Sequence, residues 1–420
     1  MAEAAADWIT NGARHIWRPY CQMKTAATAL PVARTEGVKL ILADGRELID
    51  GIGAWWTACH GYNHPHIVGA IQKQAALMPH VMLGGLVHEQ AATLSTRLAA
   101  LLPGDLDHVF YSDSGSVAVE VAMKMACQYW LNQNIRGRTK FIAFKGGYHG
   151  DTVATMAVCD PAIGMHSRFD GLLPQHYILD LPRDEESMAA LDAFLARHAD
   201  EIAGIIVEPM VQGAGGMLFQ HEDVPKRLRR FADTYNTLLI FDEIFTGFGR
   251  LGALFASQIC DTVPDIITLG KGLTGGALPL AVTVASRKVF DAFWSDDPAC
   301  ALMHGPTFMG NALGCAAANA SLDLFETEPR LFQAHEIAQK LAPRLGQLSG
   351  RPGIAAVRVR GALGVVEMER AESLTGLGPR FVAEGVFLRP FGRTLYVVPS
   401  LTIDDAALFR LTDAIVKIVG

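Results

Sequence analysis

Residues 238–276 read LLIFDEIFTGFGRLGALFASQICDTVPDIITLGKGLTGG, and two short, largely apolar runs in this stretch decide the fold. The runs cover residues 238–241 and 266–269, and each leads directly into polar residues or glycines. Runs of this kind are typical of strands that are buried on both faces of a mainly parallel sheet. Similar runs recur in the middle of the chain, at residues 108–111, 141–144, 205–207 and 281–285.

Helical patterns lie between these runs. In one of them, apolar residues recur at spacings of three and four, at Val119, Ala122, Met123, Ala126 and Trp130. Strands that alternate with helices indicate an α/β fold, in which helices cover both faces of the sheet. We therefore predict a large domain at residues 61–310, built on a mainly parallel sheet of the seven-stranded type.

The sequence changes character after about residue 310. A long alanine-rich helical region extends to about residue 347. Short strands and a terminal helix are expected beyond it, at residues 356–359, 364–367 and 395–398 and from Asp404. We predict a smaller α+β domain at residues 311–420, joined in space by an N-terminal segment at residues 1–60.

Composition and charge exclude several classes of protein. Half of the 420 residues are hydrophobic and 19% are charged, which fits a compact enzyme and excludes a disordered chain. The formal net charge is −7 and no block of Lys and Arg is present, so no nucleic-acid partner is expected. The seven cysteines contain no CxxC pair, and neither a secretory signal nor a membrane-length apolar stretch is visible. We expect a cytoplasmic protein with reduced thiols and no membrane partner.

Ligands of an open α/β sheet bind beyond the carboxyl ends of its strands, so the residues after each run are the candidates. Asp242 ends the run 238–241, and it is either a helix cap and ion-pair partner or a carboxylate that binds a ligand. Lys271 follows the next run between two glycines, which let the backbone approach a flat ligand. Burial of such a lysine lowers its pKa, so that the amine can form a Schiff base. Gly272 excludes a Walker A loop, which requires Ser or Thr at that position.

Two further segments follow predicted strands. Residues 112–116, SDSGS, open a helix, and they indicate either a phosphate site at its N-terminus or an ordinary helix cap. Residues 145–151, KGGYHGD, surround Tyr148 with glycines, which favours an aromatic ring that faces a flat ligand over simple core packing. His149 has no second His or Cys at ligand spacing, so no metal site is predicted.

Taken together, these segments resemble the class III aminotransferases of fold type I, which use pyridoxal 5'-phosphate (PLP). The signature is carried by residues 242–244, 246–250 and Lys271, and the similarity extends over nearly the whole chain. It includes the segments HIWRPY (15–20), AWW (54–56), HGYNHP (60–65), DSGS (113–116), GYHGD (147–151), MHGPTF (303–308) and RPFG (389–392). Two positions depart from the wider pattern, because Phe245 stands where many members have Gln and Leu251 where Thr is common.

The resemblance implies a role for each matching residue. Lys271 would form the Schiff base and move the proton, Asp242 would pair with the pyridinium nitrogen, and Tyr148 would stack on the ring. The phosphate would be held by Gly115 and Ser116, with Pro306 and Thr307 of the partner subunit. The substrate pocket would be shaped by Tyr20, Trp55, Tyr148, Lys271 and Gly305 of the partner subunit, with Arg389 binding the substrate carboxylate. Arg250 and Asp151 would support the site. The active unit would be a homodimer.

The two adjacent tryptophans, and Tyr20 after Arg18 and Pro19, are far more specific than the general lysine signature. If Trp55 and Trp56 lie on a strand, their side chains face opposite ways and only one lines the pocket. In Trp55, Trp56 and Tyr20 the chain resembles the members of the family that act in biotin biosynthesis. They transfer an amino group from S-adenosylmethionine to 8-amino-7-oxononanoate, giving 7,8-diaminononanoate, by a ping-pong reaction.

Several alternatives stay open from the sequence. Lysine could replace S-adenosylmethionine as the amino donor. An ω-amino acid aminotransferase or an aminomutase of the same fold is the next enzymatic hypothesis. A PLP-binding regulatory protein without turnover and a nucleotide-binding dehydrogenase are less favoured, because no helix-turn-helix extension and no glycine fingerprint is present.

Overall fold

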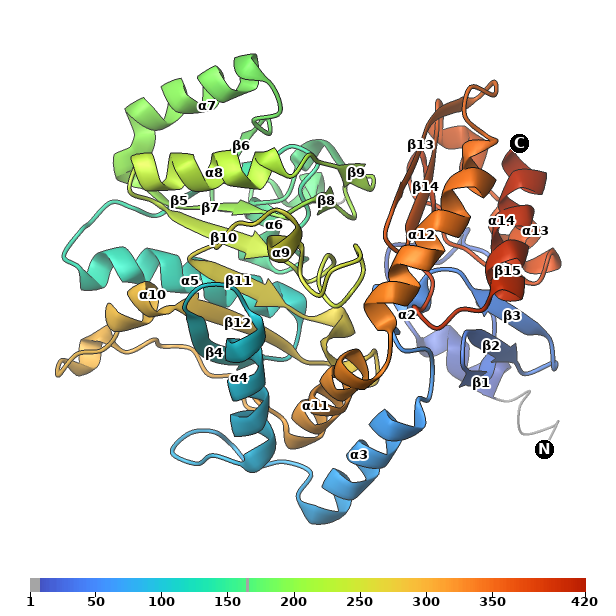
Figure 1. Cartoon of the computed structure of the whole chain (residues 1–420), viewed down its shortest axis with the longest axis horizontal. Helices are drawn as coiled ribbons and strands as arrows, with labels where there is room; N and C mark the ends of the chain where they lie inside the picture. The colour runs from blue at the N-terminus through green and yellow to red at the C-terminus, as the bar shows by residue number, and fades with distance from the viewer. Residues whose placement is uncertain (1–7, 164–165) are drawn as a thin grey trace.

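The structure is a computed structural model, and it describes residues 8–163 and 166–420. The first seven residues, on which the expectation of no secretory signal partly rests, lie outside the described residues. Among the described residues, no helix has the length and apolar character needed to cross a membrane. Figure 1 shows the large sheet on the left, the C-terminal helices α12 and α14 on the right, and the short α2 between them.

The large sheet has seven strands in the order β4-β12-β11-β10-β7-β5-β6. They are β4 (Leu106–Ser112), β5 (Lys140–Phe144), β6 (Tyr177–Leu179), β7 (Ile202–Val207), β10 (Leu238–Asp242), β11 (Ile266–Leu269) and β12 (Ala281–Ser286). Only β12 runs antiparallel to its neighbours, and the other pairings are parallel. The predicted fold class and the six predicted strands are confirmed, whereas β6 was not predicted from the sequence.

Helices cover both faces of this sheet, as continuous apolar strands require. Leu238 and Ile240 of β10 pack in the same cluster as α5 (Gly115–Asn132). Leu239 and Phe241 point the other way and pack in the cluster that contains α8 (Asp223–Thr234). Because every residue of β10 is buried, the strand is fixed from both sides, and Asp242 at its end has a fixed position.

The remaining helices of this half surround the sheet or follow its strands. They are α3 (Pro65–Leu77), α4 (Glu89–Leu101), α6 (Val153–Ala157), α7 (Glu185–His198), α9 (Ala256–Ile259) and α10 (Arg287–Asp291). A small hairpin lies beside them, formed by β8 (Val211–Gln212) and β9 (Leu218–Phe219).

Strands from the two ends of the chain meet in the second half of the molecule. A four-stranded sheet has the order β1 (Val32–Glu36), β2 (Lys39–Leu42), β3 (Glu47–Asp50) and β15 (Val386–Phe387). A three-stranded antiparallel sheet consists of β13 (Ile354–Arg360), β14 (Leu363–Met368) and β16 (Thr394–Val397). The helices here are α12 (Arg330–Gly346), α13 (Gly378–Ala383) and α14 (Asp405–Val419). The helix α11 (Ala312–Thr327) precedes them and packs with α3 and α4 beside the large sheet. The domain boundaries at residues 60 and 310 stay a prediction.

One local expectation is wrong. Trp55 and Trp56 do not lie on a strand, but on α2 (Gly53–Trp56), a single turn with left-handed backbone angles. The φ angles of Ala54, Trp55 and Trp56 are 50°, 62° and 76°, which costs about 1–2 kcal/mol for each residue with a Cβ atom. Hydrophobic periodicity carries no information on the sign of φ, so the sequence could not reveal this turn.

Candidate active site

The carboxyl ends of the parallel strands meet at one edge of the large sheet, where they line a single cavity of about 210 Å³. The segment after β4 contributes Gly115 and Ser116, and the loop after β5 contributes Tyr148 and His149. The other strands contribute Glu208 after β7, Asp242 at the end of β10 and Lys271 after β11. The structure therefore brings the strand-end residues of the sequence prediction together.

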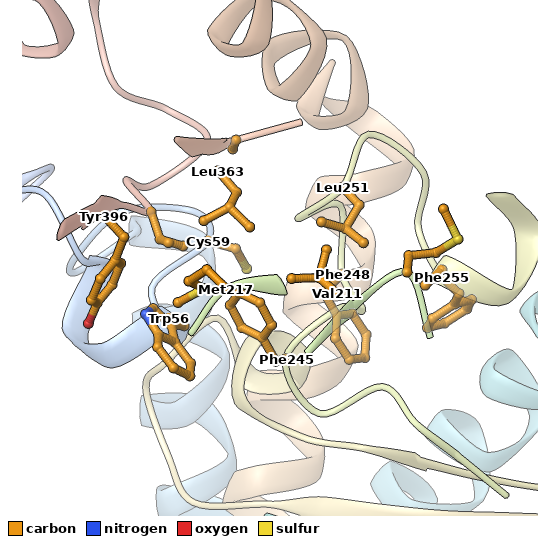
Figure 2. Close-up of a cluster of buried hydrophobic side chains, with 14 of the residues drawn as sticks. Trp56, Cys59, Val211, Met217, Phe245, Phe248, Leu251, Phe255, Leu363 and Tyr396 are labelled. Atoms are coloured by element: carbon orange, nitrogen blue, oxygen red, sulfur yellow. The ribbon is translucent and has the colours of Figure 1, made fainter. Parts of the chain in front are cut away.

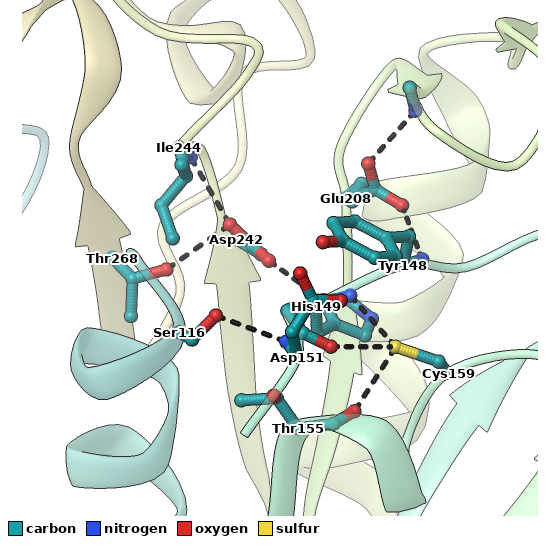
Figure 3. Close-up of polar contacts among 12 residues, drawn as sticks. Ser116, Tyr148, His149, Asp151, Thr155, Cys159, Glu208, Asp242, Ile244 and Thr268 are labelled. Carbon is teal, nitrogen blue, oxygen red and sulfur yellow. Dashed lines mark hydrogen bonds and ion pairs between the residues drawn. The ribbon is translucent and has the colours of Figure 1, made fainter. Parts of the chain in front are cut away.

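Asp242 is held by hydrogen bonds on both carboxylate oxygens. Its Oδ2 lies 2.7 Å from Nδ1 of His149, and both side chains are buried. Its Oδ1 accepts from the backbone N–H of Ile244 at 3.1 Å and from the hydroxyl of Thr268 at 3.3 Å (Figure 3). A buried carboxylate with this many partners is fixed in orientation and can hold a positively charged ring nitrogen.

His149 is a site residue that the sequence analysis did not assign. It was considered only as a metal ligand, and no group of three or more possible metal-binding side chains occurs in the described ranges. The signal that could have identified it is its position, since His149 and Asp242 both follow strands that end at the same edge.

Lys271 begins a short 3₁₀ turn, Lys271–Thr274, with a left-handed φ of 46°. Its Nζ lies 4.9 Å from the centre of the Trp56 ring and 5.9 Å from that of Phe245. Burial lowers the pKa of the Lys271 amine, although the carboxylates of Asp242 and Glu208 act in the opposite direction. A lowered pKa increases the fraction of Lys271 that is neutral, and only the neutral amine can attack a carbonyl.

Trp56 and Phe245 form an apolar wall beside this lysine. Their ring centres are 4.6 Å apart, and Trp56 also contacts the ring of Tyr396 at 5.9 Å (Figure 2). Trp56 is 5% exposed, and the sequence analysis did not assign it to the site. Phe245 gives the cavity an aromatic surface at the position where many class III enzymes carry Gln.

Glu208 is a second buried carboxyl group in the cavity. Its Oε2 accepts from the backbone N–H of Tyr148 at 3.0 Å and its Oε1 from that of Gly213 at 2.8 Å. Burial raises the pKa of Glu208 to about 7. Glu208 was not predicted either, and it fixes the position from which the ring of Tyr148 faces the cavity.

The segment after β4 forms an anion cradle. The side chain of Ser114 caps α5 by accepting from the N–H of Val117 at 3.4 Å. The first N–H groups of a helix have no acceptor within the helix, so those of Gly115 and Ser116 are available to a phosphate. A Cβ atom at Gly150 would lie 2.0 Å from Oγ of Ser116, so glycine is needed there for the two loops to meet.

The residues present fit the cofactor that the resemblance implies. The cavity contains an anion cradle at a helix N-terminus, a fixed buried carboxylate, an aromatic side chain and a lysine with a lowered pKa. These are the groups that the phosphate, the ring nitrogen, the ring face and the aldehyde of PLP require.

A polar cluster surrounds the hydroxyl of Tyr148, which lines the cavity. The hydroxyl of Tyr20 donates to Asp151 and lies 3.3 Å from the hydroxyl of Tyr148. Asp151 also contacts Nε2 of His166 at 2.9 Å, and its backbone N–H donates to Ser116 at 3.1 Å. Burial and the contact with Asp151 raise the pKa of Tyr20 to about 12. Tyr20 therefore keeps its proton at neutral pH and can donate a hydrogen bond.

Arg389 and Trp55 do not line the cavity itself, and Tyr20 connects them to Tyr148 of its lining. The guanidinium group of Arg389 stacks on the ring of Trp55, 4.2 Å from the ring centre, and the edge of Tyr20 contacts that ring at 5.8 Å. Among the residues that the structure describes, none forms an ion pair with Arg389. A stacked cation without a carboxylate partner is suited to bind a carboxylate ligand.

Arg250 does not line the cavity, but it binds the backbone of Trp56, which does. It is 2% exposed, and it donates to the carbonyl oxygens of Trp56 at 3.2 Å and Pro399 at 3.0 Å. Burial lowers the pKa of Arg250 to about 10, which leaves it charged at neutral pH. Its two hydrogen bonds tie the left-handed turn of α2 to the segment after β16.

The residues expected from a second subunit do not line the cavity of their own chain. Gly305 and Thr307 are exposed, and Pro306 is partly exposed. The three belong to the segment between Leu302 and Gly310, which packs against residues 79–88 through contacts of His80 with Phe308 and of His88 with Gly310.

The sequence profile of the class III aminotransferases matches residues 20–419. The chain is 42% identical to the adenosylmethionine-8-amino-7-oxononanoate aminotransferase of Buchnera aphidicola subsp. Acyrthosiphon pisum, over 96% of this chain and 95% of that protein. It is 44% identical to the enzyme of the same name from Corynebacterium glutamicum, with 92% of each protein covered. Among solved structures, the enzyme of that name from Methanocaldococcus jannaschii superposes with a TM-score of 0.93 at 31% identity, covering 100% of this chain and 99% of that chain. A PLP-bound amine transaminase from an uncultivated Pseudomonas species superposes with a TM-score of 0.89 at 29% identity, covering 96% and 98%.

Proposed function

This chain belongs to the class III aminotransferases, and we propose that it transfers an amino group to 8-amino-7-oxononanoate, with S-adenosylmethionine as the donor. The relatives with about 40% identity that carry this activity in their names support the proposal. The structural observation that carries it is Arg389, a cation stacked on Trp55 and linked through Tyr20 to Tyr148 of the cavity that contains Lys271.

The proposed cofactor is PLP. Lys271 would bind it covalently, Asp242 would hold its ring nitrogen, Tyr148 would face its ring, and Gly115 with Ser116 would bind its phosphate. When bound, PLP supplies an electron sink that makes a proton on the adjacent substrate carbon removable. His149 keeps the Asp242 carboxylate in place, and the burial of both side chains excludes water from the contact between them.

Lys271 has a second proposed task, which is to move a proton. Its Nζ lies against the rings of Trp56 and Phe245, whose apolar surface keeps water away from the amine. Burial lowers its pKa, so that the amine accepts a proton from carbon and returns it without holding it too strongly.

The substrate side of the site fits a molecule with an apolar chain and a distant carboxylate. Arg389 would bind the carboxylate, and the rings of Trp55 and Tyr20 would contact the methylene chain. The hydroxyls of Tyr20 and Tyr148, 3.3 Å apart, offer hydrogen bonds between this substrate side and the cavity. S-adenosylmethionine also contains a carboxylate and an amine, and the ping-pong order lets both substrates use the same groups in turn.

We propose a homodimer with shared active sites. Two adjoining segments, residues 78–88 and 301–311, expose apolar side chains that a monomer would leave in water. The side chains more than half exposed there are Met82, Leu86, Val87, Met303 and Phe308. Burial of this surface against a second copy would bring Gly305, Pro306 and Thr307 of the partner subunit to the phosphate cradle.

A hybrid dimer tests the shared site. In a heterodimer of Lys271→Ala and Thr307→Ala chains, one site carries both changes and the other site carries neither. We expect the heterodimer to have about half of the parent activity, so that a randomly paired co-expression mixture has about a quarter of it. If the mixture is no more active than the two variants alone, Thr307 does not act across an interface.

Product analysis tests the activity. The purified enzyme is incubated with 8-amino-7-oxononanoate and either S-adenosylmethionine, lysine or an ω-amine, and 7,8-diaminononanoate is measured by mass spectrometry. We expect product with S-adenosylmethionine and none with the ω-amine. Product with lysine alone would keep the acceptor assignment and overturn the donor assignment. Turnover of ω-amines with pyruvate in place of 8-amino-7-oxononanoate would overturn both.

A further inference from the structure

A buried chain of hydrogen bonds leads from the surface of the second half of the molecule to the backbone next to Lys271. Arg330, the first residue of α12, is 3% exposed and forms an ion pair with Glu328 at 2.6 Å. Its Nε donates to Nδ1 of His60 at 3.0 Å. Nε2 of His60 lies 3.0 Å from Oγ of Ser321 on α11, and Ser321 donates to the carbonyl oxygen of Gly272 at 3.3 Å.

The direction of each hydrogen bond follows from the chemistry of the groups. A guanidinium group has only donors, so Nδ1 of His60 must be the acceptor and carries no proton. Burial and the charge of Arg330 lower the pKa of His60 to about 3, which keeps the ring neutral. The single ring proton therefore lies on Nε2 and is donated to Ser321, whose own hydroxyl proton is then directed to Gly272.

The carbonyl oxygen of Gly272 has three hydrogen-bond donors directed at it. Besides Ser321, the thiol of Cys59 lies 3.5 Å away and the backbone N–H of Gly275 donates at 2.9 Å. Gly272 follows Lys271, whose φ of 46° is unfavourable for a residue with a side chain by about 1–2 kcal/mol. Strained conformations of this kind persist only where the surroundings hold them.

The space around the turn is also filled. A Cβ atom at Gly275 would lie 2.7 Å from Ile67 and 3.2 Å from the ring of His60, and one at Gly272 would lie 2.9 Å from Phe248. His60 therefore lies close to the end of the turn, and little space is left around Gly275.

We infer that Arg330, His60 and Ser321 are positioning residues that hold the Lys271 turn in its left-handed conformation and so direct the amine into the cavity. They do not touch substrate or cofactor. The chain of hydrogen bonds ties the Lys271 turn to the junction between α11 and α12, where the second half of the molecule begins. The functional part of this inference rests on the proposed role of Lys271, whereas the structural part does not.

Four variants separate the positioning role from general stability. Ser321→Ala removes the donor to Gly272, and His60→Leu breaks the chain one step earlier. In His60→Gln the amide can accept from Arg330 and donate to Ser321, so the chain is kept. Thr237→Val is the matched control, because it removes a buried hydroxyl bound to the carbonyl of Ile202 at the far end of β10.

The first readout is amide hydrogen exchange of residues 270–276 in the cofactor-free, full-length protein. We expect exchange about tenfold faster in Ser321→Ala and His60→Leu, and unchanged exchange in His60→Gln and Thr237→Val. If exchange in folded Ser321→Ala equals that of the parent, the inference is overturned. This outcome does not depend on whether Lys271 binds the cofactor. Where His60→Leu does not fold, Ser321→Ala decides the outcome.

The second readout is the kinetics of the cofactor-loaded enzyme. We expect kcat to fall about tenfold in Ser321→Ala and in His60→Leu, with KM values within about twofold of the parent, because the substrate-binding groups are on other segments. His60→Gln should restore kcat. A His60→Gln enzyme as impaired as His60→Leu would contradict the positioning role, whereas loss of the proposed function itself would appear as no turnover in the parent.

Discussion

The two sides of the cavity are built in different ways. The inner side consists of Asp242, His149, Glu208 and Lys271, which end or follow strands of one sheet. The side chains of the first three are held by hydrogen bonds. The outer side consists of loops and turns from both ends of the chain, and its aromatic side chains Tyr20 and Trp55 are 50% and 37% exposed. The difference is that the groups proposed to hold the cofactor are buried, whereas the aromatic side chains proposed to contact the substrate are exposed.

Replacement of the lysine on the inner side should have the largest effect. We expect Lys271→Ala to lower turnover by more than about a thousandfold, since both the covalent link and the proton carrier are lost. Steady-state kinetics measure the loss, and absorbance at the visible band of the bound cofactor shows whether the link to the protein is gone. Lys288→Ala, an exposed lysine on α10, is the control and should behave as the parent. A Lys271→Ala enzyme that kept both the band and the turnover would contradict the assignment.

Removal of Arg389, the cation on the outer side, should mainly change KM for the acceptor substrate. We expect Arg389→Ala to raise KM for 8-amino-7-oxononanoate about a hundredfold, because a two-pronged contact with a carboxylate is lost. The visible band of the cofactor should stay unchanged. Arg393→Ala is the matched control, since Arg393 lies on the same segment between β15 and β16 and pairs with Glu367 at 2.6 Å instead. Equal effects of the two substitutions would remove Arg389 from the substrate site.

The buried carboxyl group of the inner side predicts a pH dependence of stability. The pKa of Glu208 is about 7 in the folded protein against 4.5 for the free group, so the folded state binds more protons between these pH values. Its contribution to stability is present below pH 4.5 and is lost as pH rises through 7. Glu208→Gln should therefore gain about 3 kcal/mol of stability relative to the parent between pH 4.5 and pH 8.

A second glutamate makes this test specific to the cavity. Glu243 is also buried, accepts from the backbone N–H groups of Ala256 and Ser257, and has a pKa raised by burial to about 7. Denaturant unfolding at several pH values should show the same trend for Glu243→Gln. Only Glu208→Gln should also shift the absorbance of the bound cofactor, because Glu208 lines the cavity and Glu243 does not. Identical spectra for both variants would separate Glu208 from the site.

The paired tryptophans allow the two sides to be compared at neighbouring positions. Trp56, 5% exposed, belongs to the core beside Lys271, and we expect Trp56→Leu to lower the free energy of unfolding by about 3 kcal/mol. Trp55 is exposed in part, and Trp55→Leu should cost less than about 1 kcal/mol while it raises KM for the acceptor severalfold. Denaturant unfolding and acceptor kinetics of the two variants give the comparison. A stability loss that is larger for Trp55→Leu would reverse the assignment of the two rings.

The sequence predicts the inner side far better than the outer side, for a physical reason. Strands buried on both faces appear as apolar runs, and the polar residues that end them are brought to one edge by the parallel sheet, as Asp242 and Lys271 show. The left-handed turn of Trp55 depends on backbone angles that periodicity does not report. The contact of Tyr20 and Trp55 with Arg389 joins segments more than three hundred residues apart, and only the resemblance to a family pointed to it.

The residues that sequence reasoning missed are those that act through another group. His149 and Glu208 show no motif of their own, because each is defined by the partner it holds in space, Asp242 or the backbone of Tyr148. Arg330 and Ser321 are further from any motif, and only the path of hydrogen bonds reveals them.

The most direct test of the whole account is the absorbance spectrum of the purified, PLP-loaded enzyme during the two half-reactions. Addition of S-adenosylmethionine alone should abolish the visible band of the bound aldehyde cofactor, and addition of 8-amino-7-oxononanoate should restore it. In Arg389→Ala the band should be present before any addition, but its restoration should need about a hundredfold more acceptor. A parent enzyme without the band, even after PLP is added, would contradict the assignment of Lys271 and the account that is built on it.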